Sequence, residues 1–309
     1  MRSVSPSEIE VYLRCREEHR LAYVEGWRPK VSAPELRFGT VVHAGLARWW
    51  ETRSLGAALA ELRRSATEEG LDPWETVRAE VMLTGYDARW SDDGIETLLV
   101  ERPFRVQRLM HAEPFALGGK IDGAGRLGER TFVVEHKTTS SPLDAGSEYF
   151  ARLVIDHQVS LYAVAARELG LEPDTCLYDV LRKPDVDPKL ATPPEDRRYT
   201  KEGKLYARQR ETDETPDEYR ARLVEKVCAE PDSYFARVQV VLIEHELRAA
   251  VEAFDEIAQE IVAAYDREGV AIRTPGACRR YGRLCDFWKT CTGGEEPTGD
   301  RFVKITRRG

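Results

Sequence analysis

The chain has 309 residues, of which 42% are hydrophobic and 32% carry charge of either sign, a composition that supports a folded core and argues against disorder. Its formal net charge of −8 excludes a strongly basic protein that coats nucleic acid nonspecifically, although a local basic groove remains compatible with it. The first residues lack the apolar stretch of a signal peptide, and no apolar run approaches the roughly 18 residues of a membrane span. We therefore expect a soluble, cytoplasmic protein with no membrane attachment.

The beginning of the chain, residues 1–95, is predicted to be helical. Ser5 is a suitable N-cap, Pro6 fits the first helical position, and Glu8 completes a capping-box pattern, so a first helix should begin here. Further helices are expected over residues 36–52, 55–69 and 73–90.

Alternation typical of strands begins near residue 97 and marks the expected core, residues 96–183. The expected order is a strand over 97–108, a strand in FALGGKIDGAG (115–125), a strand in TFVVEHK (131–137), a long helix over 148–169 and a strand over 176–183. Strand, helix and strand in that order predict a crossover connection and a parallel pair.

The remainder of the chain is expected to complete this core and then to lose periodicity. Residues 184–216, rich in proline and charge, are interpreted as a loop or insertion. A helix over 215–229, a strand over 234–243 and a helix over 244–268 should follow, within a single domain that spans 1–309. The tail, 273–309, is rich in glycine and cysteine and should need an external staple to hold its shape.

Acidic and basic side chains gather at the ends of two predicted strands. Glu135 and Lys137 are two apart, so on a strand they share one face while His136 points to the other. A hairpin would bring Asp122 beside Glu135, and two carboxylates with a lysine suit Mg²⁺ or Mn²⁺. A surface salt bridge of Glu135 with Lys137 or Lys120 is the alternative. The apolar run before Glu135, where an isolated charge is costly, favours the metal site.

Two more features lie on predicted helices. His43 stands in RFGTVVHAGLARWW, where a lone histidine is more often a core or surface residue than a ligand. Gln158 and Tyr162 are four residues apart and share one helix face, for which helix packing is the alternative explanation.

The ordered set of His43, Asp122, Glu135-x-Lys137 and Gln158-x3-Tyr162 resembles the RecB-type branch of the PD-(D/E)XK nuclease superfamily. SPSEIEVYLRCREEHRLAYVEG and RFGTVVHAGL also resemble that branch, and the resemblance extends over residues 5–291. Similar domains occur in RecB, AddA and AddB, in CRISPR-associated RecB-like exonucleases and in phage relatives. The resemblance implies an α/β fold with a restriction-endonuclease-like core, in which helices flank a central mixed sheet.

The resemblance also implies which groups hold the catalytic Mg²⁺ or Mn²⁺. Asp122 and Glu135 would be ligands, joined by the backbone carbonyl of His136, while His43 would approach from the helix side. Glu101, in the strand before Asp122, is a candidate supporting acid.

The same resemblance assigns the remaining catalytic roles. Lys137 would orient the attacking water, and Gln158 and Tyr162 would line the site and position DNA.

Three cysteines, Cys278, Cys285 and Cys291, form a C-x6-C-x5-C pattern near the end of the chain. A disulfide within this trio would leave one thiol unpaired, and Cys15 is available as a fourth soft metal ligand. Some members of the resembled branch use one N-terminal and three C-terminal cysteines to bind a [4Fe-4S] cluster that clasps the chain ends. The spacing departs from the C-x2-C-x5-C of several relatives, which affects Cys278 most.

Zinc bound by the same thiols, or cysteines that hold no metal, are the alternatives to an iron–sulfur cluster. Cys176 and Cys228 fall within a predicted strand and a predicted helix, and we expect both to be small core residues.

The function implied by the resemblance is that of a metal-dependent DNA nuclease, and specifically an exonuclease on single strands or duplex ends. DNA repair, recombination, phage DNA processing and CRISPR spacer acquisition are candidate settings. Since the net charge is negative, DNA should bind in a confined groove lined by arginine and lysine. The sequence holds no G-x-x-x-x-G-K-[ST] motif, so a helicase or recombination partner would have to unwind DNA. The alternatives are a catalytically inactive DNA-binding or assembly subunit and a noncatalytic protein stapled by zinc.

Overall fold

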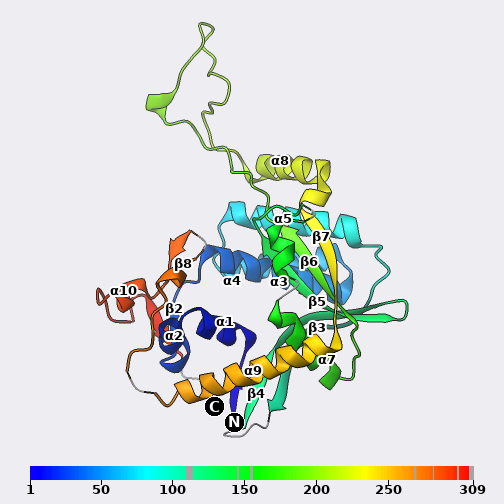
Figure 1. Cartoon of the computed structure of the whole chain (residues 1–309). Coiled ribbons are helices and arrows are strands. Elements are labelled where there is room, and N and C mark those ends of the chain that lie inside the picture. Colours follow the sequence, from blue (N-terminus) through cyan, green and yellow to red (C-terminus); the bar gives the residue numbers. More distant parts are fainter. Residues whose placement is uncertain are drawn as a thin grey trace.

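The computed structural model describes residues 1–108, 114–144, 146–153, 156–267, 269–280, 282–297 and 299–305. Within these ranges, a mixed six-stranded sheet lies between two layers of helices, as expected for a restriction-endonuclease-like core (Figure 1). None of the helices in these ranges has the length and apolar character needed to span a membrane.

The sheet is built around one long central strand. Its order is β1 (Arg2–Val4), β4 (Phe115–Leu127), β5 (Arg130–Thr139), β6 (Thr175–Arg182) and β7 (Phe235–Val241), and β3 (Glu96–Arg108) pairs with the other edge of β4. The β1–β4 and β5–β6 pairs are parallel, and the other pairs are antiparallel. The parallel β5–β6 pair confirms the predicted crossover.

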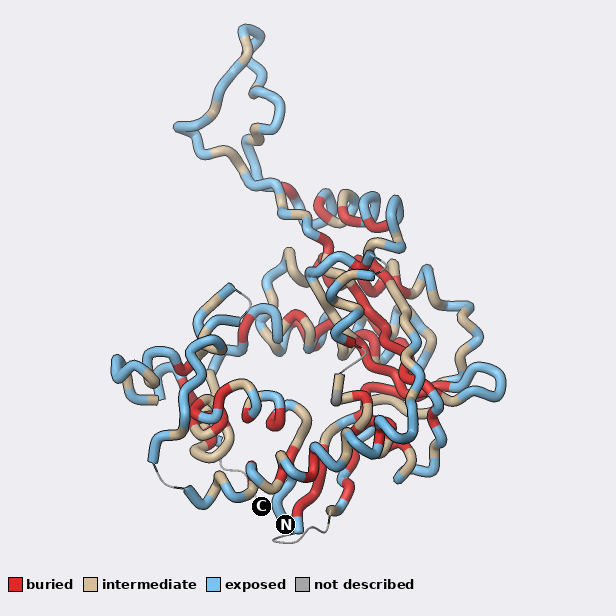
Figure 2. The backbone as a smooth tube through the Cα atoms, viewed as in Figure 1, coloured by how far each residue is buried: buried red, intermediate tan, exposed pale blue. Residues whose placement is uncertain are grey.

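Each face of the sheet has its own hydrophobic core. One is covered by α3 (Pro34–Thr52), α4 (Leu55–Glu68), α5 (Pro73–Trp90) and α8 (Pro216–Ala229). The other is covered by α1 (Pro6–Arg14), α7 (His157–Glu168) and α9 (Glu244–Ala264). Val134 joins the first core and its neighbour Val133 joins the second, because successive strand residues point to opposite faces. Figure 2 shows the buried strands between these layers.

The single helix predicted over 148–169 was wrong, because two helices occupy this segment. They are α6 (Glu148–Leu153) and α7, and residues 154 and 155 between them lie outside the described part of the chain. Asp156 has an extended backbone and its carboxylate accepts the N–H of Gln158 at 3.0 Å. Asp156 is therefore the N-cap of a new helix.

The first helix begins as predicted and ends at Arg14. The Ser5 hydroxyl accepts the N–H of Glu8 at 3.2 Å, which confirms the cap. Cys15 then takes an extended backbone, with φ −157° and ψ 112°, and separates α1 from the short α2 (Arg16–His19). A single π-helical turn, η1 (Arg20–Val24), follows.

The C-terminal segment folds back onto this N-terminal region. Strand β10 (Phe302–Lys304) pairs antiparallel with β2 (Trp27–Pro29). Phe287 and Phe302 stack on each other and pack with Leu21 and Ala22 in a small third core. The other elements of this segment are η4 (Pro275–Ala277), β8 (Arg279–Arg280), β9 (Arg283–Leu284) and α10 (Trp288–Cys291).

The two cysteines expected in the core differ in exposure. Cys176 is buried on β6, as predicted, whereas Cys228 is exposed and that prediction was wrong. Helix α8 buries Tyr219, Leu223 and Val227, a stripe at intervals of four residues, and Cys228 lies next to this stripe.

Residues 184–215, which we call the arm, leave the body between β6 and α8 and project away from it (Figure 1). Most of the arm is exposed (Figure 2). Its helical content is a single 3-10 turn, η2 (Pro194–Asp196). A second such turn, η3 (Pro231–Ser233), precedes β7.

Gly26 is expected to be essential for docking β10 on β2. Its φ is +81°, its carbonyl accepts the N–H of Ile305 at 2.8 Å, and a Cβ here would collide with the Ile305 carbonyl oxygen. Gly26→Ala should lower the free energy of unfolding in a chemical denaturation experiment. Gly128→Ala is the matched control, because φ is +61° there but a Cβ would meet nothing within 4 Å. In the control, the free energy of unfolding should fall by only about 1–2 kcal/mol, the cost of a left-handed backbone in a residue other than glycine. An equal loss in both variants would contradict the close approach of β10.

Candidate active site

The candidate site lies where β4 and β5 separate. Their pairing ends with Gly123 opposite Val134. One residue farther along β4, the Asp122 carboxylate accepts the backbone N–H of His136 at 3.1 Å. This separation lies at a cleft of about 1560 Å³ that is lined by α3, the middle of β4, the end of β5, and α6.

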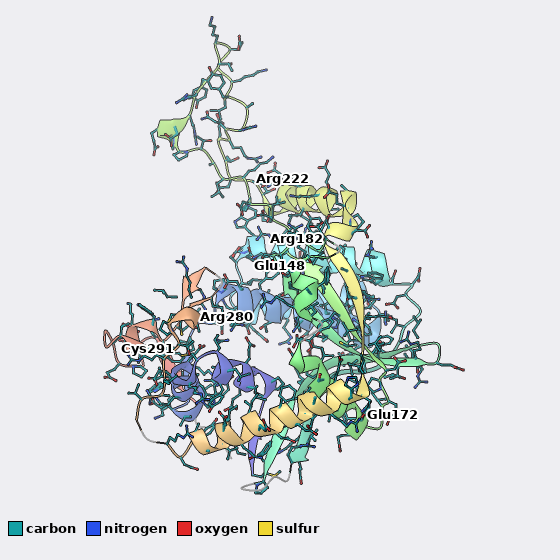
Figure 3. All side chains as sticks on the ribbon, viewed as in Figure 1. Glu148, Glu172, Arg182, Arg222, Arg280 and Cys291 are labelled. Carbon is teal, nitrogen blue, oxygen red and sulfur yellow. The ribbon has the colours of Figure 1, made fainter. Side chains whose placement is uncertain are left out.

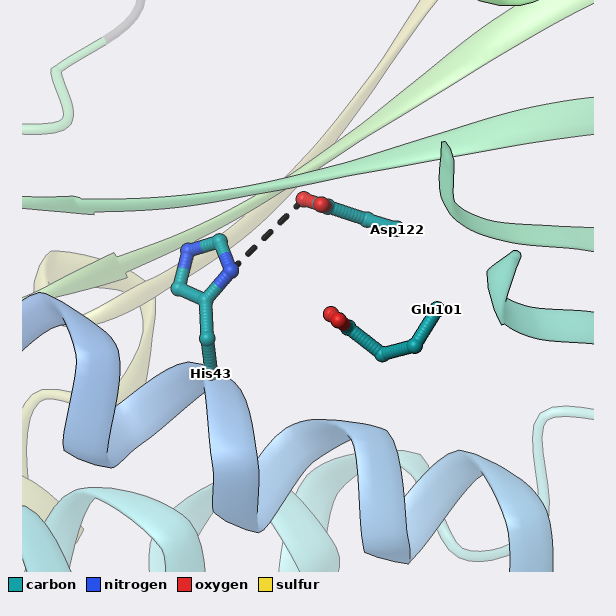
Figure 4. Close-up of side chains that lie close together, drawn as sticks. All are labelled: His43, Glu101 and Asp122. Atoms are coloured by element: carbon teal, nitrogen blue, oxygen red, sulfur yellow. Dashed lines mark ion pairs between the residues drawn. The ribbon is translucent and has the colours of Figure 1, made fainter. Parts of the chain in front are cut away.

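Three side chains form a group that could hold a metal ion (Figure 4). One ligand atom each from His43, Glu101 and Asp122 lies within 4.8 Å of the others, and Nδ1 of His43 is 3.7 Å from Asp122. Helix α3 supplies His43. Strands β3 and β4 supply Glu101 and Asp122, which face each other because the flanking residues pair across the two strands. Carboxylate oxygens with one imidazole nitrogen suit Mg²⁺ or, more fully, Mn²⁺.

Glu101 has a more central place than the supporting role predicted for it. Its φ is +49°, a left-handed conformation that costs a non-glycine residue about 1–2 kcal/mol. Such strain concentrates at functional sites, where surrounding structure holds it in place. Lys120 forms an ion pair with Glu101 across the strands. The antiparallel pairing of β3 with β4, which places Glu101 opposite Asp122, was not predicted from the sequence, and it is this register that brings Glu101 to the site.

Glu135 is buried and has one oxygen free for a ligand. Its Oε1 is 2.6 Å from Nζ of Lys137, while Oε2 has no hydrogen-bond partner among the described residues. Burial, followed by the nearby charge of Asp122, raises the pKa of Glu135 to about 8. A buried oxygen without a partner is costly unless something binds it, so Glu135 fits a cation ligand.

Lys137 is fixed by polar groups of α7. Its Nζ donates to Oε1 of Gln158 at 3.2 Å and lies 3.4 Å from Asp156, and Gln158 in turn donates to the Tyr162 hydroxyl at 2.7 Å. Burial acts to lower the pKa of Lys137, but Glu135 and Asp156 outweigh it and raise the pKa above its usual value. The structure thus brings together Glu135, Lys137, Gln158 and Tyr162. Sequence reasoning missed Asp156, which its N-cap position before α7 could have revealed.

His43 is in the form that binds cations. Burial lowers its pKa to about 4, although the Asp122 charge acts in the opposite direction. The ring is therefore neutral at pH 7, as a metal-binding imidazole must be.

The His136 ring points to the opposite face of β5 from the Glu135 carboxylate and packs behind the site. It lies 3.4 Å from Asp179 and meets the rings of Trp50 and His43 edge to face, at centroid distances of 5.7 and 6.0 Å. Burial acts to raise the pKa of Asp179, but the charge of Arg237 and the hydrogen bonds from His136 and Tyr86 together outweigh it and lower the pKa to about 2. The His136 ring therefore lies beside an aspartate that is ionised at neutral pH.

The cleft has a mixed lining rather than the basic one that we expected, because six acidic residues line it together with five cations, Arg48, Lys120, Lys137, Arg152 and Lys183. Its cations include Lys120 and Lys183, but Glu101 pairs with the first and Glu75 pairs with the second at 2.6 Å. Acidic residues, Glu35 among them, also line the cleft. Repulsion by these acids requires a bound cation, or a positive surface elsewhere, to hold a phosphate backbone.

The four cysteines predicted to bind a cluster lie at the junction of the two chain ends. Cys285 and Cys291 pack against the small third core, and Cys15 is buried at the α1–α2 break (Figure 3 labels Cys291). Burial and then the charge of Glu17 raise the pKa of Cys291, and Cys15 and Cys278 contribute to the same effect. Among the described residues, no three cysteine sulfurs lie within 4.8 Å of one another.

Comparisons with known proteins identify a family. The family model described as the PD-(D/E)XK nuclease superfamily matches residues 3–292. No curated protein matches the chain. A solved structure titled "Crystal structure of SSO0001" is similar at 10% identity, over 77% of this chain and 88% of that one. Its TM-score is 0.30, too low to support any argument.

The raised pKa of Glu135 predicts how stability changes with pH in metal-free protein. The folded state holds a proton on Glu135 up to about pH 8, whereas an unfolded glutamate releases it near pH 4.3. Wild-type protein should therefore lose stability relative to Glu135→Gln as pH rises through this window. Chemical denaturation in a chelator, from pH 5 to pH 9, measures the difference. A constant difference would show that burial does not perturb Glu135.

Proposed function

Because the chain belongs to the PD-(D/E)XK nuclease superfamily, we propose that it is a metal-dependent DNA nuclease of the RecB-type branch. We propose further that it is an exonuclease on single strands or duplex ends. The observation that carries the proposal is the meeting of His43, Glu101 and Asp122 beside the Glu135–Lys137 pair.

The side chains at the site fit a hard divalent cation. His43, Glu101 and Asp122 offer ligand atoms, Glu135 adds a buried oxygen without a partner, and the backbone carbonyl of His136 is a further proposed ligand. Bound Mg²⁺ or Mn²⁺ would supply positive charge that stabilises the phosphate in the transition state and makes water more acidic.

The chain's own residues would position water and DNA. The Lys137 ammonium, held between Glu135 and Gln158, can donate a hydrogen bond to a water in line with the phosphorus. A new phosphorus–oxygen bond forms with that water as the bond to the leaving sugar oxygen breaks. Gln158 and Tyr162 set the direction of Lys137 and line the path of the DNA strand.

The setting follows from this activity. A cytoplasmic nuclease of this kind, acting as one domain over 1–309, would serve DNA repair, recombination, or phage or CRISPR DNA processing. A helicase or recombination partner would supply single strands.

We also propose a [4Fe-4S] cluster on Cys15, Cys278, Cys285 and Cys291. Thiols around one tetrahedral zinc ion would lie about 3.8 Å apart, given Zn–S bonds of about 2.3 Å. Cys285 and Cys291 pack in the small third core and the Cys278 carbonyl accepts the N–H of Cys285 at 2.9 Å, while among the described residues no three of the sulfurs lie within 4.8 Å of one another. The break in the helix at Cys15 and the pairing of β2 with β10 both favour a staple here.

Removing the central side chains should abolish cleavage. Asp122→Ala removes a carboxylate from the proposed metal group, and Lys137→Ala removes the group that orients water. Each should slow hydrolysis of a single-stranded oligonucleotide with Mn²⁺ by at least about a hundredfold. Asp174→Ala, at an exposed carboxylate outside the cleft, is the matched control and should retain activity.

The same assay tests the alternative of an inactive DNA-binding subunit. Cleavage by wild type that stops with a chelator supports the nuclease. DNA binding without cleavage in either Mg²⁺ or Mn²⁺ would show that the site is vestigial. Wild-type rates in Asp122→Ala or Lys137→Ala would refute the assigned residues.

The cluster has its own test. Cys285→Ala should remove the brown absorbance of an iron–sulfur protein and lower the melting temperature, because the tail loses its tie to the first helix. Cys228→Ala, at an exposed cysteine on α8, should change neither. Metal analysis that finds one zinc and no iron, or a Cys285→Ala protein with unchanged colour and melting, would overturn the cluster.

A further inference from the structure

The tip of the arm carries a concentration of positive charge that the cleft lacks. Residues 197–210 contain six arginines and lysines and one glutamate, a net charge of +5 in a chain of −8. The rest of the arm, 184–196 and 211–215, contains seven acidic residues and one lysine. A polyanion would therefore be attracted to the tip and repelled by the stalk.

Hydrogen bonds within the arm, and between the arm and α8, stabilise its conformation. At the stalk, Arg197 donates to the carbonyls of Thr192 and Glu211, at 2.9 and 3.0 Å. At the base, the buried Glu214 accepts from Arg222, at 2.6 Å, and ties the arm to α8 (Figure 3). These bonds fix the arm in one shape and present its tip to solvent.

The cations of the tip divide into two classes. Arg197 and Arg210 are half-buried and bind arm carbonyls, and Arg210 also donates to Glu218 at 2.8 Å. Four others are exposed, and their side chains form no ion pair or hydrogen bond with the described residues; these are Arg198, Lys201, Lys204 and Arg208. The two half-buried arginines stabilise the conformation of the arm, and the four exposed cations are available to bind a ligand.

The register of the tip places two of these cations around an aromatic ring. Tyr206 donates its N–H to Arg198 and Thr200 donates to Lys204, at 3.0 and 2.7 Å, so a short antiparallel hairpin forms. Because side chains alternate along a strand, Arg198, Lys204 and Tyr206 share one face. Tyr199, which bridges Leu205, is on the other face.

We propose that this face of the tip binds a single DNA strand. Arg198 and Lys204 would bind successive phosphates, and a base would stack on Tyr206, which is 52% exposed. Basic groups around exposed aromatic rings are the usual means of holding single strands without regard to sequence. The inference rests on the proposed function, because it takes DNA as the substrate.

The arm also begins at the cleft. Lys183, the residue before the arm, lines the cleft, so a strand that leaves the site would pass to the tip without following the acidic stalk. The tip would hold the part of the strand that is not being cut. An arm that retains the substrate between cuts would favour repeated cleavage of one molecule.

Binding to the full chain tests the proposal without requiring cleavage. Affinity for a fluorescent 30-nucleotide single strand is measured by anisotropy in a chelator over a range of salt. Arg198→Ala/Lys204→Ala should weaken binding about twentyfold at 0.1 M salt and reduce the salt slope by about 1.4, the contribution of two phosphates. Arg126→Ala/Arg130→Ala makes the same charge change on the exposed β4–β5 hairpin and should leave both quantities as in wild type.

The two tyrosines provide a second matched pair. Tyr206→Ala should weaken single-strand binding fivefold or more through the lost stacking, and Tyr206→Phe should restore it. Tyr199→Ala, at an equally exposed tyrosine (51%) on the other face, should bind as wild type. Melting temperatures equal to that of wild type would confirm that all these surface variants fold.

Unchanged affinity and salt slope in the double cation variant would overturn the proposal and favour an acidic protein as the partner of the arm. Loss of binding in the cation variant with no effect of Tyr206→Ala, and equal affinity for duplex, would overturn the single-strand assignment. The outcome is separable from the nuclease proposal. If the protein binds DNA through the tip but does not cleave it, only the nuclease proposal is refuted. If the protein cleaves DNA and the tip substitutions leave DNA binding unchanged, only the proposal that the arm binds DNA is refuted.

Discussion

Three carboxylates on three adjacent strands must be held close together in partly buried surroundings, and the structure around them meets that constraint. Glu101, Asp122 and Glu135 repel one another when ionised, and burial adds to the penalty. Each has a compensating group: Lys120 faces Glu101, the His136 N–H and His43 face Asp122, and Lys137 faces Glu135. The compensation is incomplete at Glu135, whose carboxyl therefore keeps a proton up to about pH 8 until a cation takes its place.

A second layer of charge keeps this arrangement in place. Asp179, one strand farther into the sheet, is buried with Arg237, whose guanidinium also bonds Asp93 at 2.7 Å and the Tyr86 hydroxyl at 2.9 Å. This network contacts the His136 ring, while the His136 backbone N–H bonds Asp122. One residue thus links the buried ion network to the proposed ligands. A buried, hydrogen-bonded network of this kind restricts the rotamers around a site more than apolar packing does.

Sequence reasoning found what local pattern encodes. The cap at Ser5, the crossover from β5 to β6 and the shared face of Glu135 and Lys137 all follow from a few neighbouring residues. It missed features that depend on distant contacts or on backbone strain. Strands of three residues, such as β2 and β10, carry no periodicity, and their pairing joins opposite ends of the sequence. The positive φ of Glu101 depends on geometry that composition does not reveal. Net charge predicted a basic groove, but the cleft mixes acidic and basic residues, and four exposed cations without partners among the described residues lie on the arm.

The pairing of β2 with β10 also determines the order in which the protein can be assembled during synthesis. The core strands and their covering helices are complete once residue 264 has been made, whereas Trp27–Pro29 must wait for Phe302–Lys304. Over that interval Leu21 and Ala22 lack Phe287 and Phe302, their partners in the small third core. A nascent chain would therefore pass through a stage in which the sheet is formed but β2 has not yet paired with β10. At that stage Cys15 would still lack Cys278, Cys285 and Cys291, the three cysteines that the proposed cluster requires from the tail.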